Sequence, residues 1–181
     1  GLTSLQTLSI SSDQVTDAGV EHLKGLTNLK LLSLSNSNEV TDAGLEHLKG
    51  LTNLKTLNLQ ETKLTDAGLE HLKGLTSLQS LSLPYTQVTG AGLVHLKELT
   101  NLQTLVLIDT KVTDADLVHL KGLAGLQMLN LRDTRVTGAG LVHLVELTNL
   151  STLLLDGGVD DAGLVHLKRL TSLRHLAIQC P

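Results

Sequence analysis

An eleven-residue segment occurs seven times in this chain, and this repetition restricts the possible folds more than any other feature. The copy at residues 40–50 reads VTDAGLEHLKG, and successive copies start 23 to 25 residues apart. The copies begin at Val15, Val40, Leu64, Val88, Val112, Val136 and Val159. A fixed period of this length is typical of solenoids, in which one small unit is stacked many times. Packing keeps such units alike, so we expect function to lie where they differ.

Each unit contains two hydrophobic periods. In residues 50–73, Leu57 and Leu59 alternate with polar residues, which predicts a short strand with one buried face. Leu69 and Leu72 are three residues apart, a spacing that predicts a short helix. A unit of strand, turn, helix and turn cannot bury its apolar side alone, so neighbouring units have to stack on one another.

The predicted helix carries signals at both ends. Thr65 and Asp66 offer side-chain oxygens to the free N–H groups of the first turn, and Gly74 suits a left-handed helix end. The aspartate recurs as Asp17, Asp42, Asp66, Asp114 and Asp161, whereas Gly90 and Gly138 interrupt the series. We interpret the series as helix caps rather than calcium ligands, because a cap needs only one aspartate per unit.

The fold class predicted from this pattern is α/β, as one right-handed solenoid with parallel strands on one side and short helices on the other. The chain has 181 residues and no Phe or Trp, so its core has to be built from small aliphatic side chains in a regular layout. We expect a single domain over residues 1–181. Its seven units are 1–24, 25–49, 50–73, 74–97, 98–121, 122–145 and 146–168, and a partial eighth is 169–181.

The consensus LxxLxLxxTxVTDAGLxHLKGLTNL is similar to the leucine-rich repeat, and looks most like bacterial 24-residue repeats related to the cysteine-containing subclass. This resemblance covers essentially the whole chain, and implies a horseshoe with its sheet on the concave side. The slot that commonly holds Asn or Cys after the strand holds Thr62, Thr86, Thr110 and Thr134. We therefore expect these threonines to make the hydrogen bonds between units. Asp13, Ser37 and Gly158 depart from the pattern, which predicts irregular turns.

Composition and motifs argue against several classes of function. The net charge is −4 and no Lys/Arg run occurs, which disfavours nucleic acid. No apolar run is long enough to span a membrane, which argues against membrane insertion. The lone Cys180 excludes an intramolecular disulfide, and we expect it to be inert. No phosphate loop or distinct catalytic set can be singled out, so we predict no cofactor, no metal and no enzymatic activity. The compartment stays open.

A column of histidines repeats with the units: His22, His47, His71, His95, His119, His143 and His166. A metal ladder or a pH sensor is conceivable, but no second ligand recurs beside each histidine at a ligand spacing. Helix geometry instead predicts that each histidine packs near the Glu70 position of an adjacent unit. Tight burial of this column would make stability fall below about pH 6, because charging aligned imidazoles is unfavourable.

The Glu70 position itself changes along the chain. It holds glutamate in the first three units and valine in the next four, and unit six has a further valine where other units have lysine. The valines are Val94, Val118, Val142, Val145 and Val165. Either they pack against the neighbouring histidines, or they form an apolar stripe for a partner or a second copy.

The outward strand positions also differ between the units. They are small and polar in units one to three, but gather apolar and charged residues in units four to seven. The candidate partner-binding residues are Tyr85, Val106, Ile108, Asp109, Met128, Asn130, Arg132, Asp133, Leu154 and Asp156. Tyrosine and arginine are enriched at binding hot spots, which favours a contact surface. The alternative is drift on an unused surface.

We therefore predict a non-catalytic module that binds or scaffolds a protein or peptide. One alternative is a structural segment of a longer or self-associating array, because apolar residues such as Leu5 and Leu176 leave both ends of the stack uncapped. A second is the recognition domain of a larger enzyme. A third, an engineered consensus sequence, is mildly disfavoured by the irregular spacings.

Overall fold

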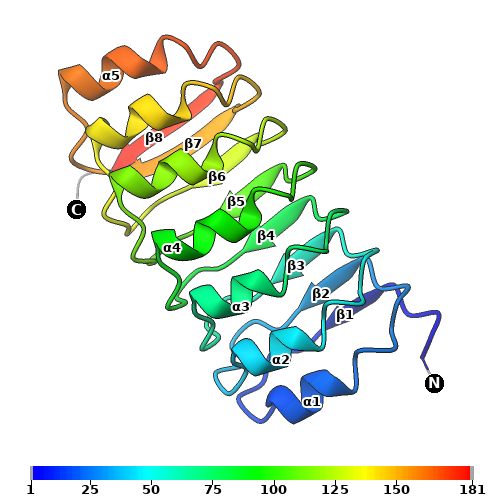
Figure 1. Ribbon diagram of the computed structural model, residues 1–181. Helices are drawn as coiled ribbons and strands as arrows, with labels where there is room; N and C mark the ends of the chain where they lie inside the picture. The colour runs from blue at the N-terminus through cyan, green and yellow to red at the C-terminus, as the bar shows by residue number, and fades with distance from the viewer. Residues whose placement is uncertain (1, 180–181) are drawn as a thin grey trace.

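The computed structural model describes residues 2–179 and confirms the predicted α/β solenoid (Figure 1). Eight parallel strands form one sheet, and each strand pairs with the next one along the chain. The strands are β1 (Thr7–Ser9), β2 (Leu31–Ser33), β3 (Thr56–Asn58), β4 (Ser80–Ser82), β5 (Thr104–Val106), β6 (Met128–Asn130), β7 (Thr152–Asp156) and β8 (His175–Gln179). The α-helices are α1 (Asp17–Glu21), α2 (Asp42–Glu46), α3 (Asp66–Glu70), α4 (Gly90–Leu93) and α5 (Asp161–Leu167).

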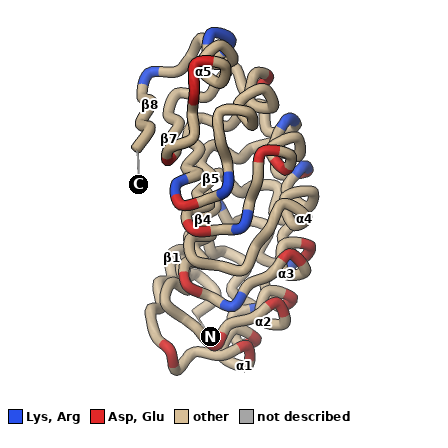
Figure 2. The backbone as a smooth tube through the Cα atoms, turned by 90° about the vertical axis from the view of Figure 1, so that its left-hand side faces the viewer, with Lys and Arg blue, Asp and Glu red and all other residues tan. Residues whose placement is uncertain are grey.

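The strands line one side of the molecule and the helices line the other (Figures 1 and 2). Units five and six differ from the prediction of an α-helix, because their helical segments η2 (Asp114–Leu120) and η3 (Gly138–Leu144) are 3-10 helices. A 3-10 segment, η1 (Val94–Leu96), also follows α4. The segments η2 and η3 are seven residues long, and the strands of units five and six keep their parallel register beside them.

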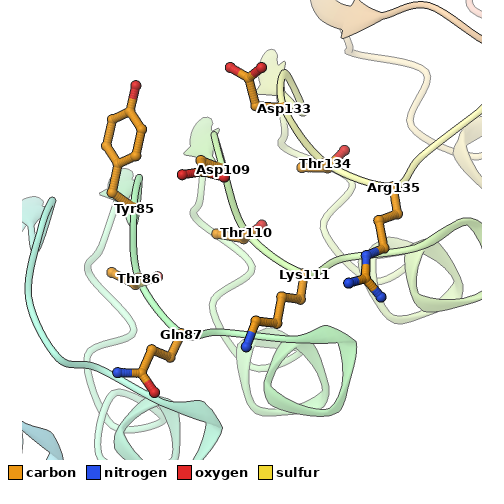
Figure 3. Close-up of a pocket in the computed structure, with 9 residues that line it drawn as sticks. All are labelled: Tyr85, Thr86, Gln87, Asp109, Thr110, Lys111, Asp133, Thr134 and Arg135. Atoms are coloured by element: carbon orange, nitrogen blue, oxygen red, sulfur yellow. The ribbon is translucent and has the colours of Figure 1, made fainter.

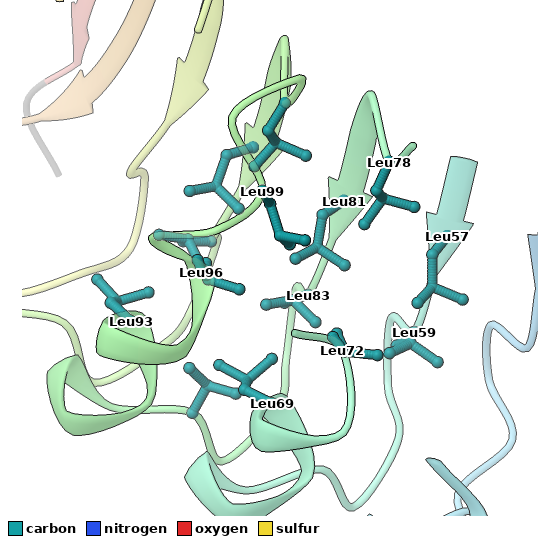
Figure 4. Packing of buried hydrophobic residues seen from close by; sticks show 14 of the residues in the cluster. Leu57, Leu59, Leu69, Leu72, Leu78, Leu81, Leu83, Leu93, Leu96 and Leu99 are labelled. Atoms are coloured by element: carbon teal, nitrogen blue, oxygen red, sulfur yellow. The ribbon is translucent and has the colours of Figure 1, made fainter. Parts of the chain in front are cut away.

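The core consists of layers of leucine that run the length of the stack (Figure 4). Within unit three, Leu57 in β3 and Leu59 just after it meet Leu69 and Leu72 from the helical side, and all four are fully buried. The register aligns Leu57 with Leu81 of the next strand. Burying one leucine side chain stabilises the fold by about 1.5–3 kcal/mol, so this regular layer supports each of the inner units.

The predicted left-handed helix end at Gly74 is wrong. Gly74 has no left-handed backbone, because consecutive right-handed turns, closed by Leu75 N to Leu72 O and Leu78 N to Leu75 O at 2.9 Å, lead into the next strand. The left-handed residues lie instead directly after the strands, and most are not glycine: Asn36, Glu61, Tyr85, Asp109 and Asp133, with φ between 52° and 59°. Gly158 is left-handed too, with φ of 86°, one residue later in its unit, as expected for an irregular turn there.

The conserved-looking threonine after each strand does not link the units. Thr62 donates its hydroxyl hydrogen bond to Leu59 O at 2.7 Å, within the same unit, and Thr86 bonds Leu83 O in the same way. The left-handed residue before each threonine folds the chain back over the strand end, so the nearest free carbonyl lies three residues earlier. Ser37, which replaces this threonine in unit two, is buried and its hydroxyl has no partner within residues 2–179.

Side chains elsewhere carry the hydrogen bonds between units. Asn53 donates to Thr27 O at 2.9 Å, and the same bond recurs from Asn28, Asn101 and Asn149. At the helix starts, the aspartates do not cap their own helix. The carboxylate of Asp66 accepts from Thr89 N at 2.7 Å and from Thr89 Oγ1 at 2.6 Å, in the next unit. Stacked helices place this aspartate beside the following threonine, and we call the contact the Asp–Thr clasp.

The clasp explains the glycine two residues after each aspartate. A Cβ added to Gly92 would lie 2.5 Å from Asp66 Oδ1, and one added to Gly68 would lie 2.3 Å from Asp42 Oδ1. The aspartate of one unit therefore occupies the space that a side chain at this position of the next unit would need. This arrangement joins units one to two, two to three, three to four, and five to six.

The two units that lack the aspartate are compensated in the following unit. Gly90 replaces it in unit four, and unit five carries Asp116 where other units have the glycine. The Asp116 carboxylate accepts from Thr113 N at 2.8 Å and Thr113 Oγ1 at 2.7 Å, so an aspartate of unit five itself binds the two groups that an aspartate of the preceding unit binds elsewhere. Where Gly138 replaces the aspartate in unit six, Asp160 stands in the threonine position and accepts from Gly163 N at 2.9 Å.

Candidate functional site

The predicted binding residues divide into two groups in the structure. The first group lies on the outer face of β5 to β7 and directly after these strands, and we call this surface the strand-face patch. It comprises Val106, Ile108, Met128, Asn130, Arg132, Leu154 and Asp156. Strand register brings them together, since Val106 pairs with Asn130 and Asn130 pairs with Leu154. All are half-buried except Asn130, which is 7% exposed and offers little surface to a partner.

Asn130 supports its neighbour rather than facing solvent. Its side-chain oxygen accepts a hydrogen bond from Arg132 N at 3.2 Å, and Asn58 makes the same bond to Gln60 in unit three. This bond fixes the backbone of Arg132 at the end of β6. The Arg132 Nε atom is buried and has no hydrogen-bond partner within residues 2–179. Buried polar atoms are nearly always paired in folded proteins, so this Nε–H is an exception.

The second group consists of Tyr85, Asp109 and Asp133, which lie in the turns after β4, β5 and β6. Their left-handed backbone turns the chain away from the strands. Their side chains therefore lie along the border that the carboxyl ends of the successive strands form, which we call the turn edge (Figure 3). A left-handed tyrosine is uncommon, and its ring is 50% exposed. Asp133 N donates to the carboxylate of Asp156, which joins this edge to the end of β7.

A groove of about 440 Å³ runs along this edge. It is lined by three equivalent three-residue segments, 85–87, 109–111 and 133–135 (Figure 3). Sequence reasoning missed Gln87, Lys111 and Arg135 on its lower side. Their signal was present, because the position after the threonine varies from unit to unit. This position lies two residues beyond the last of the outward positions on which the sequence-based prediction rests.

The histidine column is only half-buried, and His22 at the end of the stack is exposed. The histidines are therefore not tightly buried, and the loss of stability below about pH 6 that tight burial would cause has no structural basis. The predicted neighbours are confirmed in the first units. A hydrogen bond and the charge of Lys24 lower the pKa of Glu21, and His47 of the next unit lowers it further. Glu46 forms an ion pair with Lys49 of the same unit at 3.1 Å.

Metal and membrane features were also examined within the part of the chain that the structure describes. In residues 2–179, no group of three or more His, Cys, Asp or Glu side chains is placed to hold a metal ion. Every helix in that range is too short or too polar to cross a membrane. Cys180 lies outside the described residues.

The valines of the later units are exposed on the helical side. Val94, Val118, Val142 and Val165 are between 38% and 54% exposed, whereas Val145 is half-buried. Packing against the histidines therefore leaves a third or more of these four side chains in solvent. The first unit is also uncovered, since an apolar hollow of about 460 Å³ lies beside Leu5, Leu8 and Ile10.

Comparison with known proteins agrees with this architecture. Residues 36–88 match a family described as Leucine rich repeat. An internalin C2 (inlC2) from Listeria monocytogenes is 28% identical, with a TM-score of 0.77, and the match covers 98% of this chain and 82% of that one. An internalin (inlF) from the same bacterium shares the fold at 20% identity and a TM-score of 0.50, over 97% of this chain and 61% of that one.

No curated protein sequence matches the chain significantly. The matched residues 36–88 contain the same unit that the rest of the chain repeats, and the similarity to internalin C2 extends over nearly all of it. The bacterial source of both solved structures agrees with the resemblance to bacterial repeats, and the subclass stays a prediction. The repeated unit, the stacked parallel strands and these matches make the chain similar to leucine-rich-repeat proteins.

Proposed function

We propose that this chain is a non-catalytic module that binds a protein or peptide through the strand-face patch. The observation that supports this most is the change of surface character along one continuous sheet. The second outward column changes from Ser33 and Asn58 in units two and three to Val106 and Leu154 in units five and seven. The first column gains Met128 in unit six, although it also holds the apolar Leu31 in unit two. A packed core gains nothing from outward apolar side chains.

Arg132 is the anchor of this proposal. Arg132 occupies the same repeat position as Ile108 in unit five and Asp156 in unit seven, and its Nε is buried and unpaired within residues 2–179. Asp156, on the neighbouring strand, already accepts a hydrogen bond from Asp133 N. A carboxylate of the partner would satisfy the arginine in surroundings of reduced polarity, where such a hydrogen bond is strong.

The repeat supplies matched controls for a binding test. Peptides selected from a random display library against the parent chain are measured against the variant Met128→Ser with Arg132→Ala. The control carries Leu31→Ser and Gln60→Ala, which alter the same two columns in units two and three. We expect the patch variant to weaken binding by at least about tenfold, as for hot-spot residues, and the control to have no effect. Equal affinity for both variants would refute the proposal.

Self-association is a second candidate, favoured by the exposed valine stripe. Val142 and Val165 lie on adjacent units, so two copies could cover each other's stripe. Light-scattering mass is measured over a hundredfold concentration range for the parent and for Val142→Ser with Val165→Ser. A rise in mass that the double variant abolishes supports association through the stripe, whereas a constant monomer mass rejects it.

A further inference from the structure

The groove along the turn edge is bordered by two rows of opposite charge. Asp109 and Asp133 lie on the upper row with Tyr85, and Lys111 and Arg135 lie on the lower row with Gln87 (Figure 3). Threonines of the same three segments form the floor between the rows. Figure 2 shows acidic and basic residues close together on the part of the chain beside β4 and β5.

The charged side chains of both rows form no ion pairs within residues 2–179. Neither Lys111 nor Arg135 forms an ion pair within residues 2–179, and no hydrogen bond there reaches the Asp109 or Asp133 carboxylate. The equivalent lysine of unit three, Lys63, differs in this respect. It pairs at 2.8 Å with Glu39 of the preceding unit.

The reason is the residue that precedes each cation by one unit. The same position in the preceding unit holds Glu39 for Lys63, but Gln87 for Lys111 and Lys111 for Arg135. The lower row therefore neutralises itself in units two and three and cannot do so in units five and six. The open charges coincide with the groove, which begins at unit four.

The arrangement of charges selects one kind of partner. A phosphate backbone or an anionic lipid surface would meet the acidic row, and a polycation would meet the basic row. An extended polypeptide projects successive side chains to opposite sides, so one that follows the groove presents alternate residues to the two rows. Neighbouring units are about 4.8 Å apart, so three units span about 14 Å, which is the length of about four extended residues.

From this complementarity we propose that the groove binds an extended segment of a partner protein in which basic and acidic side chains alternate. The basic side chains contact Asp109 and Asp133, and the acidic ones contact Lys111 and Arg135. The exposed ring of Tyr85 lies at the unit-four end and covers the aliphatic stem of a bound lysine or glutamate. The groove is separate from the strand-face patch, so this inference does not depend on the proposed function.

The test uses two labelled octapeptides with identical composition and net charge, measured by fluorescence anisotropy at low salt. One alternates Lys and Glu, and the other has four Lys followed by four Glu. We expect the alternating peptide to bind more tightly, and the variant Lys111→Glu with Arg135→Glu to weaken its binding by about tenfold, because two attractive contacts become repulsive. The matched control, Lys24→Glu with Lys49→Glu, makes the same change of net charge on the helical side.

Each outcome decides the proposal. Equal binding of the two peptides, equal loss in the helical-side control, or no binding of the alternating peptide at millimolar concentration would overturn it. Binding to vesicles of anionic lipid with affinity above that for the peptide would assign the lower row to a membrane surface instead. The strand-face variant Met128→Ser with Arg132→Ala should leave peptide affinity unchanged, so failure of the strand-face proposal and failure of this one are distinguishable.

Discussion

The exchange of aspartate and glycine between units four and five predicts a strong energetic coupling. Gly90 and Asp116 are each unusual for their position, but together they leave Thr113 bound by an aspartate of its own unit. Restoring the common pattern requires both Gly90→Asp and Asp116→Gly. Each single change breaks the arrangement, whereas the double change re-creates the contact that the other clasped units have.

The cost of each single change follows from the contacts. Asp116→Gly removes a carboxylate that accepts two hydrogen bonds from Thr113, at 2.8 and 2.7 Å. Half-buried hydrogen bonds to a charged group and a glycine within a helical turn together predict a loss of about 2–3 kcal/mol. For Gly90→Asp, an added Cβ would lie 1.7 Å from Asp116 Cγ. Overpacking and the repulsion of two carboxylates predict a loss of about 2–3 kcal/mol as well.

The double variant should recover most of this loss. We expect its free energy of unfolding within about 1 kcal/mol of the parent, which gives a coupling energy of about 3 kcal/mol or more. Urea unfolding of the four proteins measures this, provided that the slopes with denaturant agree and a single transition is seen. Additive losses, or a double variant less stable than either single one, would show that the two positions do not share one site and would refute the reasoning.

Three further predictions concern stability. Gly68→Ala should destabilise by about 2 kcal/mol in urea unfolding, because its Cβ enters the space of the preceding unit's clasp, whereas Gly74→Ala, with no atom within 4 Å, should be neutral or slightly stabilising. Thr86→Val should cost about 1 kcal/mol through the unsatisfied carbonyl three residues earlier, and an unchanged melting temperature would contradict this. The hydrogen bond and the charge of Lys49 lower the pKa of Glu46. The contribution of the Glu46 carboxylate to stability is therefore present above the pKa of the unfolded chain and is lost as pH falls through the folded pKa. Glu46→Gln should flatten the acid side of the stability profile, and an unchanged acid limb would count against this ion pair.

The sequence alone determined the architecture because its two periods leave one solution. Alternating leucines such as Leu57 and Leu59 require a strand with one buried face, and Leu69 and Leu72 require a helix against that face. A 24-residue unit has too little apolar surface to fold alone, so stacking follows from the number of copies. The same periods predicted which strand positions face outward, and the register of the sheet agrees.

The hydrogen bonds between units could not be predicted, because they depend on distances across the stack rather than along the chain. Asp66 reads as a helix cap in the sequence, yet its carboxylate lies beside Thr89 of the next unit. Gly90 and Asp116 read as two unrelated exceptions, and only their common location shows that one compensates the other.

The candidate site divides in the same way. Comparison of equivalent positions located the variable region in units four to seven, since such variation is visible along a repeated sequence. The left-handed turns at Tyr85, Asp109 and Asp133 then carry these side chains off the strand face and onto an edge. There they meet Lys111 and Arg135 from the following turn, and the chain's own path brings opposite charges to one groove. Periodicity predicts which residues share a face, but the tertiary structure decides which residues share a site, because a site depends on where each turn directs its side chains.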